Sequence, residues 1–350
     1  MPTNRNPLKG WQLQRSDIGY VGHDLRRPEC ILAQSDGTLW TADARGGIMR
    51  IAADGRQTLI AESQADARID AKSGVERVIL EGTLPNGVAF DSNGDFLIAN
   101  FGTDRLELMR RDGTSTVLHD NIDGEPIGKA NFVLTDSKGR IYMTVTTRLQ
   151  PWTRSINEKT PDGYIALIDG KGIRIVADGF VGTNEIRFDA NEEWLYVVES
   201  NGKRISRLCV REDGTLGERE IFGPSNLGTG FPDGFAFDAF GNLWITMIMA
   251  ERLIALTPEG DVLELFDDGV PPAVAAVERH YLEGTVTPEI LAACQGTVAP
   301  WMASVTFGGP DLRTVYLGSL LGNRLPYFRG PVAGLPLPHW HRQFDLKETA

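Results

Sequence analysis

The feature that most constrains the fold of this 350-residue chain is a hairpin motif that recurs six times along it. In the clearest copy, FPDGFAFDAFGNLWIT at 231–246, alternating apolar residues flank a Gly-Asn turn, and Asp233 stands at the entrance. Alternation with a period of two predicts a β-strand, and Gly-Asn between two such runs predicts a hairpin. Every copy pairs an entrance residue with a turn, and an aromatic or apolar residue lies in its second strand.

The entrance residues, which we call the anchors, are separated by 45 to 57 residues, with a last interval of about 70. A repeat of this period, built from hairpins and further strand-like runs, is typical of a β-propeller. The sequence therefore predicts an all-β, six-bladed β-propeller that occupies residues 1–350 as a single domain. The segment around 11–18 or the last strands near Tyr327 would close the ring. The anchors are Glu29, Asn86, Asn131, Asn184, Asp233 and, in the sixth copy, Ala303 or Ser304.

Two segments, 149–161 and 270–300, depart from this rhythm. Residues 149–161 are expected to lengthen the third blade with a polar loop. Residues 270–300 carry apolar residues at helical spacing, with Thr287 as an N-cap before Pro288, and predict a short helical insertion. Such an insertion would serve as a lid or as a subunit contact. The proline-rich tail at 330–341 predicts an extended surface chain, with His339 and His341 at the surface.

Charge and composition exclude several classes of partner. A net charge of -12 leaves no basic excess to neutralise phosphates, so no nucleic-acid partner is expected. No apolar run approaches the ~20 residues needed to span a bilayer, and no membrane partner is expected. The N-terminal stretch lacks the apolar core of a secretory signal, and three scattered cysteines suit a reducing compartment. A cytoplasmic location is therefore expected.

The anchors are the residues with chemical content. Inner strands of a propeller run beside the central axis, so equivalent positions on them are expected to converge at one end of the channel. Five of the six anchors carry side-chain oxygens, which suit one hard divalent cation, with calcium first and magnesium, manganese or zinc as alternatives. A purely structural explanation also exists, because Asn or Asp before glycine commonly forms turns. It applies most to Asn86 and least to Glu29.

Three stretches of the chain are distinctive: PEC at 28–30, FPDGFAFDAFGNLW at 231–244 and, most specifically, FGGPDLRTVYLGS at 307–319. They resemble the senescence-marker-protein/gluconolactonase/luciferin-regenerating-enzyme family. The resemblance covers roughly residues 25–330 and implies a propeller that binds one divalent metal in its channel and hydrolyses lactones. Carried onto this sequence, it implies that Glu29, Asn184 and Asp233 hold the metal and that Asn131 lines the substrate pocket.

The sequence departs from that family around Asn131. The family often has Arg two residues earlier and Asp-Gly directly afterwards, whereas this chain has Lys129 and a Phe-Val pair. A lysine is a point charge without the fork that grips carboxylates and vicinal hydroxyls, so a more apolar substrate than a sugar acid is favoured. The candidate substrate-binding residues are Asn131, Asn86, Lys129 and Arg148.

A cation held by carboxylate and amide oxygens would polarise an ester or lactone carbonyl, and Asp233 is the candidate ligand that also acts as general base. The sequence therefore predicts a divalent-metal-dependent hydrolase of a lactone or related ester, acting on a small molecule, with a homo-oligomer left open. One alternative is metal-dependent cleavage or elimination on a non-lactone substrate. Another is a non-catalytic propeller that serves as a binding scaffold.

Overall fold

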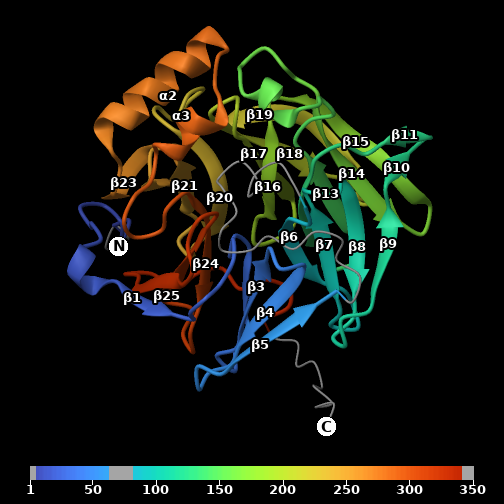
Figure 1. The fold of residues 1–350 in the computed structure, drawn as a ribbon, viewed down its shortest axis with the longest axis horizontal. Coiled ribbons are helices and arrows are strands. Elements are labelled where there is room, and N and C mark those ends of the chain that lie inside the picture. The colour runs from blue at the N-terminus through green and yellow to red at the C-terminus, as the bar shows by residue number, and fades with distance from the viewer. Residues whose placement is uncertain (1–4, 63–81, 341–350) are drawn as a thin grey trace.

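The computed structural model describes residues 5–62 and 82–340. Six four-stranded antiparallel sheets stand around a central axis as the blades of a propeller (Figure 1). Five of these blades use four strands in chain order, and the sixth combines strands from both ends of the chain. The prediction of an all-β, six-bladed propeller is confirmed.

The blades follow the hairpin repeat, because each predicted hairpin supplies the two innermost strands of one blade. Neighbouring inner strands contact each other from blade to blade and so line the axis. From inner to outer strand, the blades are β2 (Ile31–Ala33), β3 (Leu39–Asp43), β4 (Gly47–Ile51) and β5 (Gln57–Ala61); β6 (Pro85–Phe90), β7 (Phe96–Asn100), β8 (Arg105–Met109) and β9 (Ser115–His119); β12 (Ala130–Thr135), β13 (Ile141–Val145), β14 (Gly163–Asp169) and β15 (Gly172–Phe180); β16 (Thr183–Phe188), β17 (Trp194–Glu199), β18 (Arg204–Val210) and β19 (Leu216–Phe222); β20 (Phe231–Phe237), β21 (Leu243–Ile248), β22 (Arg252–Leu256) and β23 (Val262–Asp267); and β24 (Met302–Gly308), β25 (Thr314–Ser319), β26 (Leu325–Arg329) and β1 (Gly19–Val21).

The ring is closed by the sixth blade, where β1 pairs with β26 and Gly19 faces Tyr327. A 3-10 turn, η1 (Arg15–Asp17), precedes β1. Upstream of that turn, the ring of Trp11 packs 5.6 Å from Trp244 and 6.1 Å from Phe328. Closure therefore uses the last strands near Tyr327 together with an N-terminal strand, which begins just after the segment predicted at 11–18.

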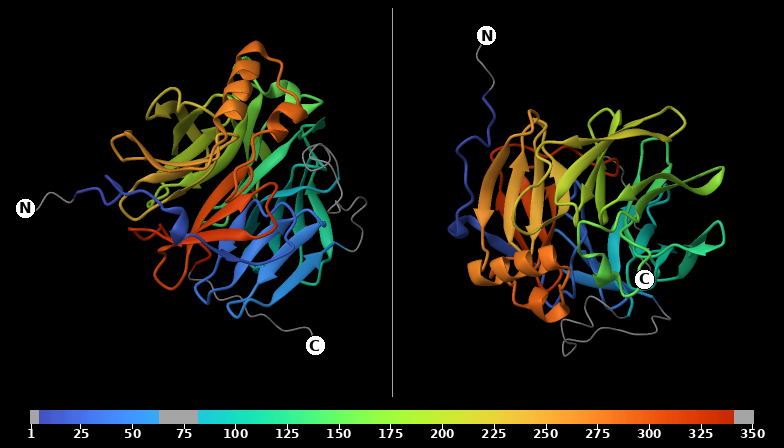
Figure 2. Two further views of the ribbon diagram at one scale, coloured as in Figure 1. Left: turned by 60° about the vertical axis from the view of Figure 1, so that its left-hand side comes forward. Right: turned by 90° about the horizontal axis from the view of Figure 1, so that it is seen from above.

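The insertion between blades 5 and 6 is helical, as predicted, and consists of α2 (Pro271–Glu283) and α3 (Pro288–Ala292). Both helices lie at one end of the propeller (Figure 2). The carboxylate of Glu278 pairs with Lys203 Nζ at 2.6 Å and accepts the backbone N–H of Gly230 at 2.8 Å. Tyr281 donates its hydroxyl to the backbone carbonyl of Asn201. These contacts fasten α2 to blades 4 and 5.

The chain also covers the other end of the channel. After β26 the segment 331–340 runs back under the propeller, where the Leu335 N–H donates to the Phe237 carbonyl at 2.8 Å. His339 is buried, and its Nε2 lies 3.1 Å from the Ala33 carbonyl oxygen. The prediction of a surface position for His339 is therefore wrong, because the tail packs across the inner strands. His341 lies outside the described residues.

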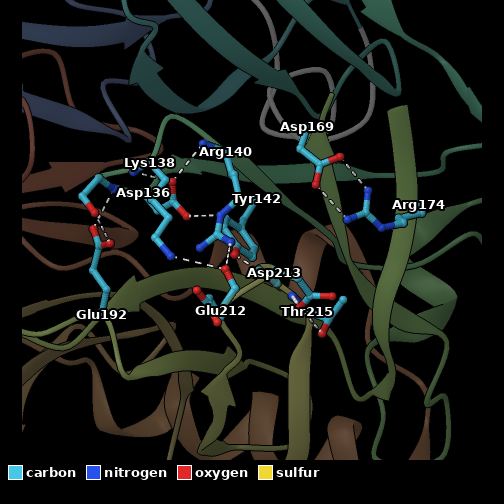
Figure 3. A network of polar contacts seen from close by, with 12 residues as sticks. Asp136, Lys138, Arg140, Tyr142, Asp169, Arg174, Glu192, Glu212, Asp213 and Thr215 are labelled. Carbon is cyan, nitrogen blue, oxygen red and sulfur yellow. Dashed lines mark hydrogen bonds and ion pairs between the residues drawn. The ribbon is translucent and has the colours of Figure 1, made fainter. Parts of the chain in front are cut away.

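Smaller elements complete the architecture: a two-stranded ribbon of β10 (Asn121–Ile122) and β11 (Glu125–Pro126), and a 3-10 turn η2 (Trp152–Ser155). The β12–β13 turn of blade 3 is tied to turns of blade 4 by a polar network (Figure 3). In it, Arg140 Nη1 donates to the Glu212 carbonyl at 2.9 Å. Of the helices in the described part of the chain, none combines the length and the apolar character that a membrane crossing needs.

Candidate functional site

The five polar anchors lie together in one pocket at the channel end that carries the helical insertion. The hollow measures about 770 Å³ when its opening toward solvent is included. Its lining combines nine polar or charged residues with nine apolar ones. They are Arg27, Glu29, Asn86, Asn131, Thr146, Asn184, Ser200, Asn201 and Asp233, and Phe101, Trp152, Ile156, Phe231, Ile248, Met249, Leu291, Trp301 and Leu320.

The anchors reach the pocket because the inner strands are irregular where the anchors occur. A break in strand register lies between Pro85 and Val88, Ala130 and Phe132, Thr183 and Ile186, Pro232 and Phe235, and Met302 and Ser304. Each break encloses an anchor, and a β-bulge of this kind re-aims a side chain out of the regular pleat. In the sixth blade the break encloses Ala303. Ala303 rather than Ser304 therefore takes the sixth anchor position.

The two anchor carboxylates, Glu29 and Asp233, are buried, with exposed fractions of 6% and 5%. Burial raises the pKa of Asp233 well above its usual value, and the charges of Glu29 and Glu185 raise it further. Burial also raises the pKa of Glu29, against the lowering effect of Arg27. A bound cation would reverse this tendency toward the neutral forms, because it favours ionised carboxylates.

Arg27 is a pocket residue that sequence reasoning missed. Its Nη1 lies 2.7 Å from Glu29 Oε2 and 3.1 Å from the Pro85 carbonyl, and its Nη2 donates to Asn86 Oδ1 at 2.7 Å. The backbone of Arg27 has φ of +52°. A cation two residues before an anchor occurs at Arg27 and again at Lys129. That spacing is the signal that could have identified Arg27.

Two amide anchors present open acceptors. Asn184 Nδ2 donates to Ser200 Oγ at 3.0 Å and to Asp233 Oδ1, whereas Asn184 Oδ1 has no hydrogen-bond partner among the described residues. Asn131 Oδ1 is also buried and unpartnered there. Buried acceptors without donors are costly, and a hard cation satisfies them. The side-chain oxygens of the anchors therefore fit a divalent cation as ligands.

The candidate cation ligands include amide side chains as well as carboxylates. Within residues 5–62 and 82–340, no three His, Cys, Asp or Glu side chains gather in an arrangement that could hold a metal ion. A cation at the anchors would thus be held by two carboxylates and by neutral oxygens. Such a set suits calcium, which accepts carbonyl-type ligands, better than it suits zinc, which favours nitrogen and sulfur.

Asn86 differs from the other amide anchors. Its Oδ1 accepts from Arg27, and its Nδ2 donates to the backbone carbonyl of Asn131 at 3.0 Å. Both ends of the amide are used within the protein, although the residue lines the pocket. In this position Asn86 orients Arg27 and links the inner strands of blades 2 and 3.

A second buried ion pair lies near the anchors. Arg187 Nη2 is 2.7 Å from Glu185 Oε2, and the Arg187 guanidinium stacks over the Phe132 ring at 4.4 Å. Burial raises the pKa of Glu185 to about 7, with Arg187 lowering it and Glu29 raising it. Arg187 and Phe132 line a smaller hollow with Leu337 of the C-terminal segment. The pair thus connects the anchors to the covered end of the channel.

Two predicted substrate contacts, Lys129 and Arg148, do not line the pocket. Lys129 Nζ lies 2.8 Å from Asp104 Oδ1 and donates to the Phe101 carbonyl at 3.2 Å. Arg148 is exposed and lies over the ring of Tyr164, 4.7 Å from its centroid. The structure therefore brings five anchors together and places these two cations outside that group.

The residues after Asn131 also lie elsewhere. Phe132 and Val133 were expected to mark an apolar substrate pocket, but neither lines the anchor pocket. Phe132 instead packs in the core under Arg187. Sequence reasoning therefore used the wrong residues, because strand alternation turns the side chain after an anchor away from the channel mouth.

A six-bladed propeller with carboxylate and amide anchors in its channel mouth is the class of protein that fold and site define. A family model described as the SMP-30/gluconolactonase/LRE-like region matches residues 28–277. The chain belongs to this family, as the resemblance of its motifs implied.

Relatives with assigned names are distant. The 6-deoxy-6-sulfogluconolactonase of Pseudomonas putida is 26% identical over 209 residues, which is 59% of this chain and 59% of that protein. A pentonolactonase of Haloferax volcanii is 24% identical over 195 residues, covering 55% and 54% of the two chains. The chain thus spans less than two thirds of these relatives.

The structure of a calcium-binding protein, regucalcin from Agrobacterium tumefaciens, superposes with a TM-score of 0.62 at 17% identity, covering 92% of this chain and 98% of that protein. That likeness shows the shared fold.

Proposed function

We propose that the protein hydrolyses a lactone or a related ester in the anchor pocket with one divalent cation. Calcium is the first candidate, and magnesium, manganese and zinc are the alternatives. Glu29, Asn184 and Asp233 would hold the cation. The observation that carries this proposal is the convergence of two buried carboxylates and two unpartnered amide oxygens in one open pocket. Family membership and the lactonase names of two relatives support it.

When bound, the cation supplies positive charge that polarises the substrate carbonyl and stabilises the negative charge that develops on its oxygen. Asp233 accepts a proton from water as the water oxygen bonds to the carbonyl carbon. Asp233 then returns a proton to the ring oxygen as the ester C–O bond breaks. Lactone and water are thereby converted into one hydroxy acid, with no other reactant.

The remaining residues hold these groups in place. Asn184 donates to Asp233 Oδ1 and keeps the amide and the carboxylate side by side. Arg27 fixes Glu29 through the contact of 2.7 Å. Asn131, with its open Oδ1, is the candidate contact to the substrate or to the cation. The apolar walls above the anchors exclude bulk water, which strengthens every charge interaction at the reacting carbonyl.

The first test is Asp233→Asn, which keeps the side-chain shape and removes both the charge and the base. We expect kcat/KM on a panel of lactones to fall by about 10³-fold. We also expect calcium affinity, measured by calorimetric titration, to fall by at least about 10-fold. The control is Asp123→Asn in the exposed turn of the β10–β11 ribbon, where a short polar side chain tolerates the φ of +54° and both values should stay unchanged.

Chelation separates the proposal from its alternatives. Activity should disappear with a chelator and return with the cation, and hydrolysis must add one water to the product mass. Full activity under chelation, or in Asp233→Asn, would contradict the mechanism. A product without added water would support elimination on a non-lactone substrate. A cation-loaded protein that turns over no member of the panel would support a binding scaffold.

A further inference from the structure

The walls of the anchor pocket differ in chemistry from its floor. The anchors form the floor, whereas the walls are apolar and contain four aromatic side chains from four blades. These aromatic residues are Phe101, Trp152, Phe231 and Trp301. Phe101 and Trp152 contact each other edge to face, with ring centroids 5.3 Å apart. Any group of the ligand that extends from the floor toward the opening therefore meets hydrocarbon and aromatic surface.

Most polar side chains in the pocket form hydrogen bonds within the protein. Thr146 Oγ1 donates to a backbone carbonyl at 2.9 Å, and Ser200 Oγ does so at 2.6 Å. Asn201 Nδ2 donates to another backbone carbonyl at 2.9 Å. Asn86 uses both ends of its amide, as described above. The open acceptors, Oδ1 of Asn131 and Asn184, belong to the floor where the reacting ester lies.

The cationic side chains nearby are committed as well. Lys129 is held by Asp104 and by the carbonyl of Phe101. Arg27 directs both terminal nitrogens to Glu29, Asn86 and a backbone carbonyl. Neither side chain is therefore available to bind the vicinal hydroxyls of a sugar. A guanidinium group without other partners could bind such hydroxyls through two of its nitrogens.

The helical insertion that covers the pocket is fixed to the propeller by specific contacts. Leu291 of α3 lines the pocket, and α2 beside it is fastened by Glu278 to Lys203 and to the Gly230 N–H. Lys203 also lies 4.5 Å from the centroid of the Tyr281 ring. Because the apolar surface is already assembled, a ligand that matches it does not need to order the wall first.

From this arrangement we propose that the substrate is a lactone that carries an apolar alkyl or aryl substituent, not a polyhydroxylated sugar lactone. The proposal rests on the proposed hydrolysis and names its substrate class. Each hydroxyl buried against the wall without a partner lowers affinity by about 10-fold. Each methylene buried there raises affinity by about 4-fold.

The main experiment compares three six-membered lactones that share one reacting ring. δ-Decalactone carries an alkyl chain, δ-valerolactone carries no substituent, and glucono-δ-lactone carries hydroxyls. With the cation-loaded protein, we expect kcat/KM for δ-decalactone to exceed that for glucono-δ-lactone by at least about 100-fold. Equal or reversed preference would overturn the inference and would leave the proposed hydrolysis in place.

A variant tests whether the wall causes the preference. Ile156→Asn puts an amide into the wall, and the ratio of kcat/KM for δ-decalactone to that for δ-valerolactone should fall by about 10-fold. The control is Val262→Asn, a similar apolar-to-amide change at a residue that is 40% exposed on the outer strand β23, where the ratio should not change. An unchanged ratio in Ile156→Asn would contradict the assignment of the wall.

A binding measurement separates this inference from the proposed reaction. Trp152 and Trp301 line the pocket, so tryptophan fluorescence reports occupancy of the wall. The wild-type protein is titrated with each lactone in the presence of chelator, where the proposed mechanism turns nothing over. If no lactone is hydrolysed under any condition but δ-decalactone binds at least about 10-fold more tightly than glucono-δ-lactone, the reaction is refuted and the apolar ligand class stands. Absence of any such difference in binding would overturn the inference.

Discussion

At the scale of single residues, the protein handles its buried carboxylates in different ways. Glu29 is paired with Arg27, and Asp233 accepts from Asn184. Glu251, in the turn between β21 and β22, is 1% exposed, and its side chain accepts a long hydrogen bond of 3.4 Å from the Met302 N–H. Its Oε1 has no partner among the described residues. Burial therefore raises the pKa of Glu251 to about 8.

This shift predicts a pH-dependent stability. A carboxyl whose folded pKa is raised keeps its proton in the folded state while the unfolded chain loses it, so stability falls as pH rises from about 5 to about 8. The loss approaches about 1 kcal/mol per pH unit. In Glu251→Gln this loss should disappear, so that the variant is more stable than the wild type at pH 8.5 and similar to it at pH 5. Urea unfolding at several pH values measures the effect.

The matched control is Glu259→Gln in an exposed turn of the same blade, which should keep the wild-type slope of stability against pH. A wild-type slope in Glu251→Gln would show that this carboxyl does not titrate between the folded and unfolded states as described.

At the scale of elements, the inner strands combine a bulge with close contact to the neighbouring blade. Gly87 follows the anchor Asn86, and a Cβ at that position would lie 2.5 Å from Phe132 Cα in β12. A Cβ at Gly234, which follows Asp233, would likewise lie 2.6 Å from the carbonyl oxygen of Ala303. At these two anchors, glycine is thus required by the approach of the next inner strand.

We therefore expect Gly87→Ala to destabilise the protein by about 3 kcal/mol, because the obstruction is backbone that cannot rotate away. The urea midpoint should fall while the dependence on urea concentration stays unchanged. Gly170→Ala is the control, since a Cβ there meets no atom within 4 Å and the position is exposed. Equal stability of the two variants would contradict this account of blade packing.

At the scale of the whole molecule, stability depends on closing a ring whose ends are far apart in sequence. β1 pairs with β26, and the ring of Trp11 packs against both Trp244 and Phe328. Without β1, the edge of β26 would be exposed for pairing with another chain. Closure therefore controls both stability and association.

Removing residues 1–21 should lower the unfolding temperature by roughly 10 °C or more and produce oligomers on size-exclusion chromatography. Gly19→Val tests the same pairing without removing Trp11, because its Cβ would come within 2.6 Å of the Tyr327 ring. A truncated chain that remains monomeric with an unchanged unfolding temperature would show that closure does not depend on β1.

The sequence by itself determined the propeller, the number of blades, the helical insertion and the positions of the anchors. These follow from local signals: period-two alternation, turn glycines, and an interval between copies that repeats. The convergence of Glu29, Asn131, Asn184 and Asp233 was predictable because equivalent positions in a propeller are related by rotation about one axis. Their roles at a cation stay predictions.

Only the tertiary structure decided what surrounds the anchors. Arg27 turns toward Glu29, Lys129 pairs with Asp104 and Phe132 packs under Arg187. The apolar walls come from strand ends, from loops and from α3, and the loops and α3 do not repeat from blade to blade. A repeat determines the backbone of the inner strands, whereas the partner of each long side chain depends on which loops pack over it. For this reason the substrate class depends on contacts that no local pattern in the sequence describes.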